Sequence, residues 1–162
     1  MKSSSHFVER YCVFRSDDRW YGMNALAVRS VTPRPAITPT PHSDPTIVGL
    51  CHLQNEFLPV LSMRSLTQIQ YDTCPETEPQ LLVLLGPEGA WGLLIDQIET
   101  LTELETSISN FSNTEDKWNK VALGSASWKN EVLEILDPSA LYEYARSLTG
   151  SFWQNSHSTQ PC

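Results

Sequence analysis

The 162-residue sequence lacks the features that mark a secreted, membrane-spanning or nucleic-acid-binding protein. No apolar run is long enough to span a bilayer, and the start Met-Lys-Ser-Ser-Ser-His has no apolar core of a signal peptide. Basic residues are scarce, since 11 Lys and Arg stand against 19 Asp and Glu and give a formal charge of -8. This charge argues against nucleic acid or an anionic membrane surface as the main partner. We therefore expect a cytoplasmic protein that does not insert into the membrane.

Cysteine and histidine are too few and too scattered for a recognisable metal site. The four cysteines contain no C-x-x-C pair and are widely spaced: Cys12, Cys51, Cys74 and Cys162. Cys12 and Cys51 lie inside apolar strand patterns, so we interpret them as small core residues. A zinc site made of Cys51, His52 and Cys74 has no precedent among the usual ligand spacings.

Catalytic motifs are also missing. The sequence has no G-x-S-x-G nucleophile elbow, no glycine-rich phosphate loop and no H-E-x-x-H pair. We therefore predict no catalytic residue, no bound metal and no cofactor. An enzyme or metal protein built around Asp96, His52 and Cys51 is the alternative hypothesis, and metal analysis of the purified protein tests it.

The most informative feature that is present is an internal repeat. Residues 49–66 return later in the chain at a constant offset, which pairs Gly49 with Gly124, Asn55 with Asn130, Glu56 with Glu131, Leu58 with Leu133, Leu61 with Leu136 and Leu66 with Leu141. A second echo precedes the first and pairs residues 11–14 with 81–84 and residues 21–23 with 91–93. Two echoes in the same order indicate a duplication in which each copy is a hairpin followed by a hairpin.

Each copy contains a turn and a helix start at matching positions. Asn tolerates the left-handed conformation of tight hairpins, so Asn55 and Asn130 are predicted turn residues. Ser62 and Asp137 are predicted N-caps, and Pro138 suits the first helical position. After it, apolar residues recur at helical spacing: Leu141, Tyr144, Ala145 and Leu148. This pattern predicts a C-terminal helix of about three turns that packs on the sheets.

The remaining expectations concern strands and connections. Apolar runs predict strands or hairpins at residues 8–14, 20–31, 46–61, 81–85, 91–101 and 121–136. The proline-rich segment 33–41 is expected to be a rigid surface connection, with a polyproline ligand for a partner as the alternative. Residues 1–7 are expected to form a mobile arm, and the polar segment 102–120 a long mobile loop.

Together these patterns predict an all-β fold with a C-terminal helix in one domain over residues 1–150. Its two lobes cover approximately residues 8–70 and 80–150, and an exchange of strands between them is left open. Residues 151–162 form a polar tail that we expect to be disordered.

With both copies placed, the chain resembles the chemotaxis coupling protein CheW family. Three stretches carry the resemblance: WYGMNALAVRSV at residues 20–31, PTIVGLCHLQNEFLPVL at 45–61 and WGLLIDQI at 91–98. The family pattern in the second stretch is Gly-Val-x-Asn-Leu-Arg-Gly-x-x-Leu-Pro-Val, whose Gly, Leu and Leu-Pro-Val positions match. The resemblance covers roughly residues 11–148.

The resemblance implies two pseudo-repeated, five-stranded SH3-like barrels packed around a shared core. It also implies a non-catalytic adaptor, or scaffold, that bridges the helical cytoplasmic tip of a chemoreceptor to the regulatory domain of a CheA-type histidine kinase in a bacterial chemosensory array. The implied partner-binding residues are Val28, Ala25, Ser30, Gln54, Leu53 and Ile98.

The chain departs from the family where the family binds its partners. The family's functional arginine is Gln54 here, which keeps hydrogen-bonding capacity but loses the charge. The family's glutamate is Ser30. Two interpretations remain open: coupling is retained with a divergent receptor or kinase, or the partners have changed, as in twitching motility or another two-component output.

Overall fold

The computed structural model describes residues 6–40, 46–67, 78–108 and 117–149. Ten strands lie in these ranges: β1 (His6–Ser16), β2 (Arg19–Asn24), β3 (Val28–Pro33), β4 (Ile47–Leu53), β5 (Glu56–Ser62), β6 (Gln80–Gly86), β7 (Gly89–Ile95), β8 (Gln97–Ile108), β9 (Ala122–Trp128) and β10 (Glu131–Leu136). The helical segments are η1 (Ala25–Ala27), α1 (Met63–Thr67), η2 (Lys117–Lys120) and α2 (Pro138–Thr149). The predicted tail at 151–162 lies outside the described residues.

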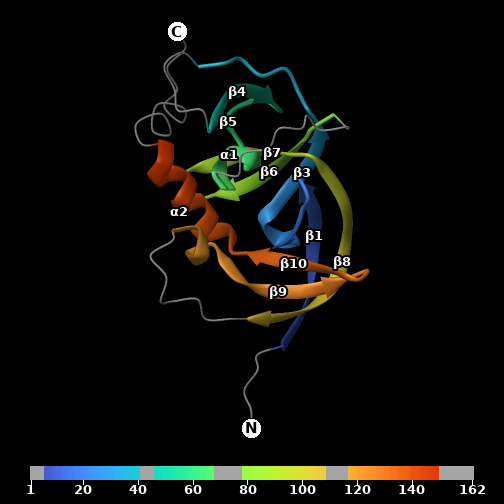
Figure 1. Ribbon diagram of the computed structural model, residues 1–162. Helices are drawn as coiled ribbons and strands as arrows, with labels where there is room; N and C mark the ends of the chain where they lie inside the picture. The colour runs from blue at the N-terminus through green and yellow to red at the C-terminus, as the bar shows by residue number, and fades with distance from the viewer. Residues whose placement is uncertain (1–5, 41–45, 68–77, 109–116, 150–162) are drawn as a thin grey trace.

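The strands form two five-stranded sheets, and each sheet draws on both copies of the repeat (Figure 1). β1, β2, β10, β9 and β8 pair in that order into a closed barrel, and the second sheet has the order β3-β6-β7-β5-β4. The pairs β2/β10 and β5/β7 are parallel, and they join strands of different copies. The predicted all-β class with a C-terminal helix is confirmed.

The second sheet differs from the expected barrel because backbone pairing does not close it. Its edge strands are β3 and β4. The outer edge of β4 is partly covered by the proline-rich connection, where the Thr38 and Leu50 backbones exchange two hydrogen bonds of 2.8 and 2.9 Å. Arg29 lies in the opposite edge strand, β3. Its side chain reaches across to the turn between β4 and β5, where it pairs with Glu56. The described part of the proline-rich segment is thus a surface connection, as predicted.

Two apolar runs expected as single strands are each broken at a crossing between the sheets. In the run 20–31, the Asn24 side chain accepts a 2.9 Å hydrogen bond from Leu26 N and starts η1, which separates β2 from β3. In the run 91–101, Asp96 separates β7 from β8. The chain therefore passes from the barrel to the second sheet at 25–27 and returns at Asp96.

The prediction of a long loop at 102–120 is also wrong. β8 continues to Ile108 against β1, and within it Leu104 and Thr106 are buried while the alternate residues Glu103 and Glu105 are exposed. Threonine on the inner face made this alternation look uniformly polar. Residues 109–116 lie outside the described part. The arm predicted at 1–7 is wrong at His6 and Phe7, which belong to β1, and residues 1–5 lie outside the described part.

The predicted turns and caps are confirmed. Asn55 and Asn130 have φ angles of 66° and 65°, in the left-handed region that the hairpin turns require. Ser62 Oγ accepts from Ser65 N at 3.4 Å, and Asp137 Oδ1 accepts from Ser139 N at 3.0 Å. These contacts satisfy amide groups that the first turns of α1 and α2 leave without a helical partner.

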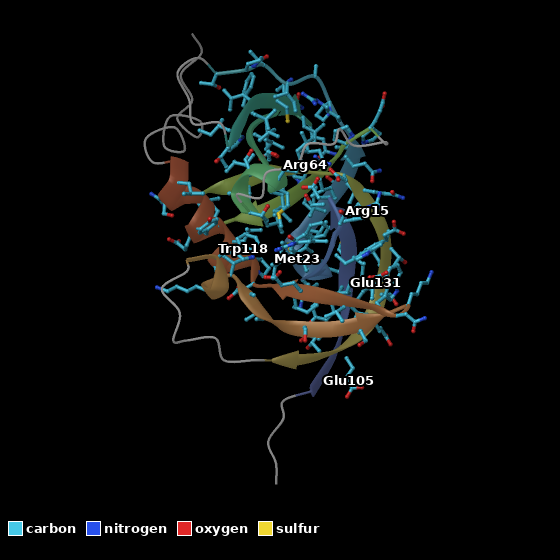
Figure 2. The ribbon with its side chains drawn as sticks, in the orientation of Figure 1. Arg15, Met23, Arg64, Glu105, Trp118 and Glu131 are labelled. Carbon is cyan, nitrogen blue, oxygen red and sulfur yellow. The ribbon has the colours of Figure 1, made fainter. Side chains whose placement is uncertain are left out.

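The largest buried cluster lies between the two sheets and under α2. It unites Met23 of the barrel, Leu82 and Trp91 of the second sheet, and Leu141 and Ala145 of α2. Figure 2 shows Met23 near the centre of the molecule. Tyr144 and Leu148 pack against this cluster, so the predicted helical stripe is confirmed. One shared core thus holds both sheets, and residues at their junction have a rigid support.

Candidate functional site: the groove between the two sheets

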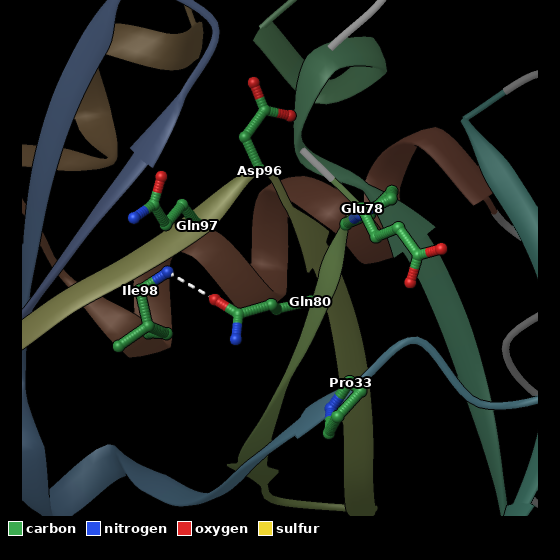
Figure 3. Close-up of a pocket in the computed structure, with 7 residues that line it drawn as sticks. Pro33, Glu78, Gln80, Asp96, Gln97 and Ile98 are labelled. Carbon is green, nitrogen blue, oxygen red and sulfur yellow. Dashed lines mark hydrogen bonds between the residues drawn. The ribbon is translucent and has the colours of Figure 1, made fainter. Parts of the chain in front are cut away.

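A groove of about 340 Å³ lies where the second sheet meets β8 of the barrel (Figure 3). Its lining comes from the end of β3, the start of β6 and the corner between β7 and β8: Pro33, Glu78, Pro79, Gln80, Asp96, Gln97 and Ile98. Two prolines and an isoleucine give it apolar walls, while carboxylates and carboxamides give it polar ones. Such a mixture suits a partner that offers both apolar and hydrogen-bonding side chains.

The side chain of Gln80 ties the two sheets together inside this groove. Its Oε1 accepts a 2.7 Å hydrogen bond from the backbone N–H of Ile98. Gln80 belongs to β6 and Ile98 to β8, so the bond crosses from the second sheet to the barrel. The Gln80 side chain is therefore held in the middle of the groove, as Figure 3 shows.

Val28 and Ile98, two predicted partner-binding residues, both lie at the junction of the sheets. Each is partly buried and packs against the shared core. Val28 is the first residue of β3, and Pro33 at the other end of β3 lines the groove. The apolar side of this junction is thus carried by rigid elements of both sheets.

The corner between β7 and β8, where Asp96 lines the groove, is held in place by a cluster of charged side chains. Arg64 Nη2 lies 2.9 Å from Asp96 Oδ2 and 2.8 Å from Asp17 Oδ1, and the Asp17 backbone N–H donates to Asp96 Oδ2 at 2.7 Å. The two carboxylate side chains are only 5% and 9% exposed. Burial raises the pKa of Asp17, the Arg64 charge lowers it, and the Asp96 charge raises it further. Because Arg64 lies in α1 and Asp17 in the β1–β2 turn, the cluster also joins the two sheets.

Comparison with known proteins agrees with this architecture. A family model of the CheW-like domain matches residues 10–146. The chain belongs to the CheW family. Its structure is similar to that of the scaffolding protein TtCheW from Thermoanaerobacter tengcongensis, with 17% sequence identity over 85% of this chain and 94% of that chain and a TM-score of 0.71. At this identity the likeness shows a shared fold. No curated protein matches the chain.

Sequence resemblance predicts that Gln54 stands at the CheW family's arginine position, and the structure shows which contact Gln54 makes. Its Oε1 accepts a 3.2 Å hydrogen bond from Nη2 of Arg29, whose Nη1 pairs with Glu56. Gln54 also has a φ of 51°, so it is the first of two left-handed residues in the β4–β5 turn. The charged pair beside Gln54 is therefore formed by Arg29 and Glu56. Arg29 directly precedes Ser30, and Glu56 directly follows Asn55.

The other predicted residues of this CheW-like domain lie around the same contact. Ser30 follows Arg29 in β3, and Leu53 precedes Gln54 and packs against the inner core of the second sheet. Ala25 lies in η1, where the chain leaves the barrel. Of these residues, Gln54 contacts Arg29, Ser30 and Leu53 are chain neighbours of that pair, and Ile98 lines the groove.

Sequence reasoning did not find Gln80, Pro33, Arg29 or Arg64 as site residues. Their partners lie far away in the sequence, since Arg64 and Asp96 are 32 positions apart and Gln80 and Ile98 are 18 apart. The one available signal was Asp96, an acid at the end of an apolar strand. It is 7% exposed and held by Arg64, so it is a structural anchor.

The residues of the alternative enzyme hypothesis are not gathered into one site. Asp96 lies between β7 and β8, whereas Cys51 and His52 lie on edge strand β4. The centroid of the His52 ring lies 4.7 Å from that of the Phe57 ring. Cys12 and Cys51 are buried as predicted, and burial raises the pKa of Cys12 to about 11. Within the described residues, no three His, Cys, Asp or Glu side chains are placed to hold a metal ion. Cys74 lies outside them. None of the helices in the described ranges is long and apolar enough to cross a membrane.

Proposed function

We propose that this protein is a non-catalytic scaffold of a bacterial chemosensory array, which couples chemoreceptors to a CheA-type histidine kinase in the cytoplasm. The observation that carries the proposal is the groove at the junction of two sheets in a chain of the CheW family. The receptor's helical cytoplasmic tip is the proposed occupant of the groove, and the kinase regulatory domain binds elsewhere on the same rigid body.

The apolar contacts at the junction support this assignment. Val28 and Ile98 are partly exposed, yet each is fixed by the shared core beneath it. A helix that lays its apolar side chains against such residues buries them with little ordering cost, because both surfaces are already rigid. The acidic net charge of -8 disfavours acidic partners and leaves basic or neutral ones.

A titration with two separate probes tests the proposal. The probes are a soluble coiled-coil fragment of the receptor tip and the kinase regulatory domain, both from the genome that encodes this chain. We expect binding of each at micromolar concentrations, as is usual for transient assemblies. If neither binds at about 100 μM, the proposal is wrong.

Val28→Asp is the variant that locates the receptor contact. An unpaired carboxylate at a desolvated contact should weaken binding of the receptor fragment by tenfold or more. Val132→Asp is the matched control, since Val132 is 71% exposed on β10 of the barrel and lies away from the junction core that Val28 contacts. Because Val28 also touches the core, Val28→Thr provides a second variant with nearly the same shape. Equal effects at positions 28 and 132 would place the receptor elsewhere.

A second candidate is the same scaffold with altered partners, as in twitching motility or another two-component output. The hydrogen bond from Arg29 to Gln54, beside the pair of Arg29 with Glu56, favours it. A partner selected for a free arginine at position 54 meets a different charge arrangement here. Binding of receptor fragments from several sensory systems of the same organism, compared in one titration series, distinguishes the two candidates.

A further inference from the structure

The orientation of the Gln80 carboxamide is fixed by its one hydrogen bond. A backbone N–H can only donate, so the atom of Gln80 that meets Ile98 N must be the carbonyl oxygen Oε1. The amide nitrogen Nε2, with two donor hydrogens, therefore points the other way. In Figure 3 it projects between the Ile98 side chain and Pro33. Among the described residues, this nitrogen has no hydrogen-bond partner.

The surroundings of Nε2 restrict what can bind to it. The nearest acidic groups of the groove are Glu78 and Asp96, and the Asp96 carboxylate is turned away from Gln80 toward Arg64. A carboxylate brought to Gln80 would meet the negative charge of Glu78. A lysine or arginine would be attracted by Glu78 but offers no acceptor to Gln80. An uncharged side chain with a carbonyl oxygen, Asn or Gln, accepts from Gln80 without adding charge to the groove.

We propose that Gln80 is a specificity-determining residue of the groove, which recognises an asparagine or glutamine side chain of the partner through its two Nε2 hydrogens. This inference rests on the proposed function, in which the partner is a helix. The backbone carbonyls in the body of a helix are already used within the helix, so along its length an acceptor comes from a side chain.

Gln80→Glu isolates the donor from the rest of the residue. Glutamate keeps an oxygen for Ile98 N–H and nearly the same shape, but it has no donor for the partner. We expect binding of the soluble receptor-tip fragment to weaken about tenfold, because a buried acceptor loses its hydrogen bond. Slow hydrogen exchange of the Ile98 amide should persist, which shows that the groove is intact. Gln80→Met removes the donor without adding charge and should weaken binding similarly.

Val132→Asp is the control for an added negative charge. Val132 lies on β10 of the barrel, outside the groove, and its replacement leaves the hydrogen bond between Gln80 and Ile98 untouched. We expect its effect on binding to remain below threefold. Each Asn and Gln of the receptor fragment is then replaced by Ala in turn. One of these replacements should weaken binding to the wild-type chain about tenfold and have almost no further effect on Gln80→Glu.

The outcomes separate the two proposals. Wild-type chain that does not bind the fragment at about 100 μM overturns the receptor assignment and, with it, this inference. Normal binding with unchanged affinity for Gln80→Glu overturns the role of Gln80 alone. A loss for Gln80→Glu that Gln80→Met does not share shows a charge effect and also overturns it, as does a fragment series in which no Asn or Gln replacement is coupled to position 80.

Discussion

Arg29 and Gln54 are joined by a 3.2 Å hydrogen bond that spans the second sheet. Arg29 lies in β3 and Gln54 directly follows β4, and these strands are the two opposite edges of the sheet. Together with the pair of Arg29 and Glu56, this bond links edges that backbone pairing leaves apart. Gln54 therefore has a structural role that its identity does not reveal.

Substitution of Gln54 by Arg is expected to depend on Arg29. In the wild-type background, the new guanidinium repels Arg29 and competes for Glu56, so the free energy of unfolding should stay unchanged or fall by up to about 1 kcal/mol. In an Arg29→Gln background, the same substitution gains Glu56 as a partner and should stabilise the protein. A double-mutant cycle by urea unfolding should give a coupling of about 0.5–1 kcal/mol. Additive effects would show that the three side chains do not interact.

Arg64 is expected to matter more for stability than a surface arginine. Arg64→Gln leaves Asp17 and Asp96 nearly buried and without their cation, which should cost about 2 kcal/mol after allowance for the partial exposure of Arg64. Arg146→Gln is the control, because Arg146 and Glu88 form an ion pair whose side chains are 35% and 37% exposed. That change should cost less than about 1 kcal/mol. Urea midpoints of the two variants compare them, and similar midpoints would contradict the anchoring role.

Gly49 is expected to tolerate no side chain. A Cβ at this position would lie 2.1 Å from the carbonyl oxygen of Thr38, and the φ of 151° is strained for other residues. Gly49→Ala should therefore push the proline-rich connection off β4 and cost about 2–4 kcal/mol. Faster hydrogen exchange of the Thr38 and Leu50 amides would locate the damage. In Gly22→Ala the contact is with a side-chain end of Ile135, so a smaller loss is expected.

Glu134 should make the protein less stable as the pH rises. Burial raises its pKa above the ordinary value of 4.5, while the Trp118 hydrogen bond and the Arg19 charge lower it. The folded protein thus holds this proton more tightly than the unfolded chain, and stability is lost as the pH rises from 4.5 through the folded pKa. Glu134→Gln keeps an acceptor for Trp118 and should flatten this part of the curve of Tm against pH. An unchanged curve would mean that Glu134 ionises freely in the folded state.

The parts of the fold that could be predicted from the sequence depend on neighbouring residues. The turns at Asn55 and Asn130 and the caps at Ser62 and Asp137 follow from local backbone chemistry, so their positions were correct. The stripe of α2 was visible because helical periodicity is independent of the packing partner.

The crossings between the sheets could not be predicted in the same way. Residues 20–31 and 91–101 carry apolar residues on both sides of each crossing, and a run that two sheets share does not reveal where one sheet ends. In the site, Val28 and Ile98 were reached through family resemblance. Gln80 and Arg64 were not, since each acts through a contact that only the folded topology creates.

The exchange of strands between the two sheets also determines when the protein can fold during its synthesis. β1 and β2 leave the ribosome first, yet their barrel neighbours β8 and β10 begin only at Gln97 and Glu131. At about 5–20 residues per second, the first strands wait for several seconds with Phe14 and Met23 uncovered. Nascent chains that stop before β10 should therefore bind chaperones or aggregate, and neither half of the gene should yield a folded protein by itself.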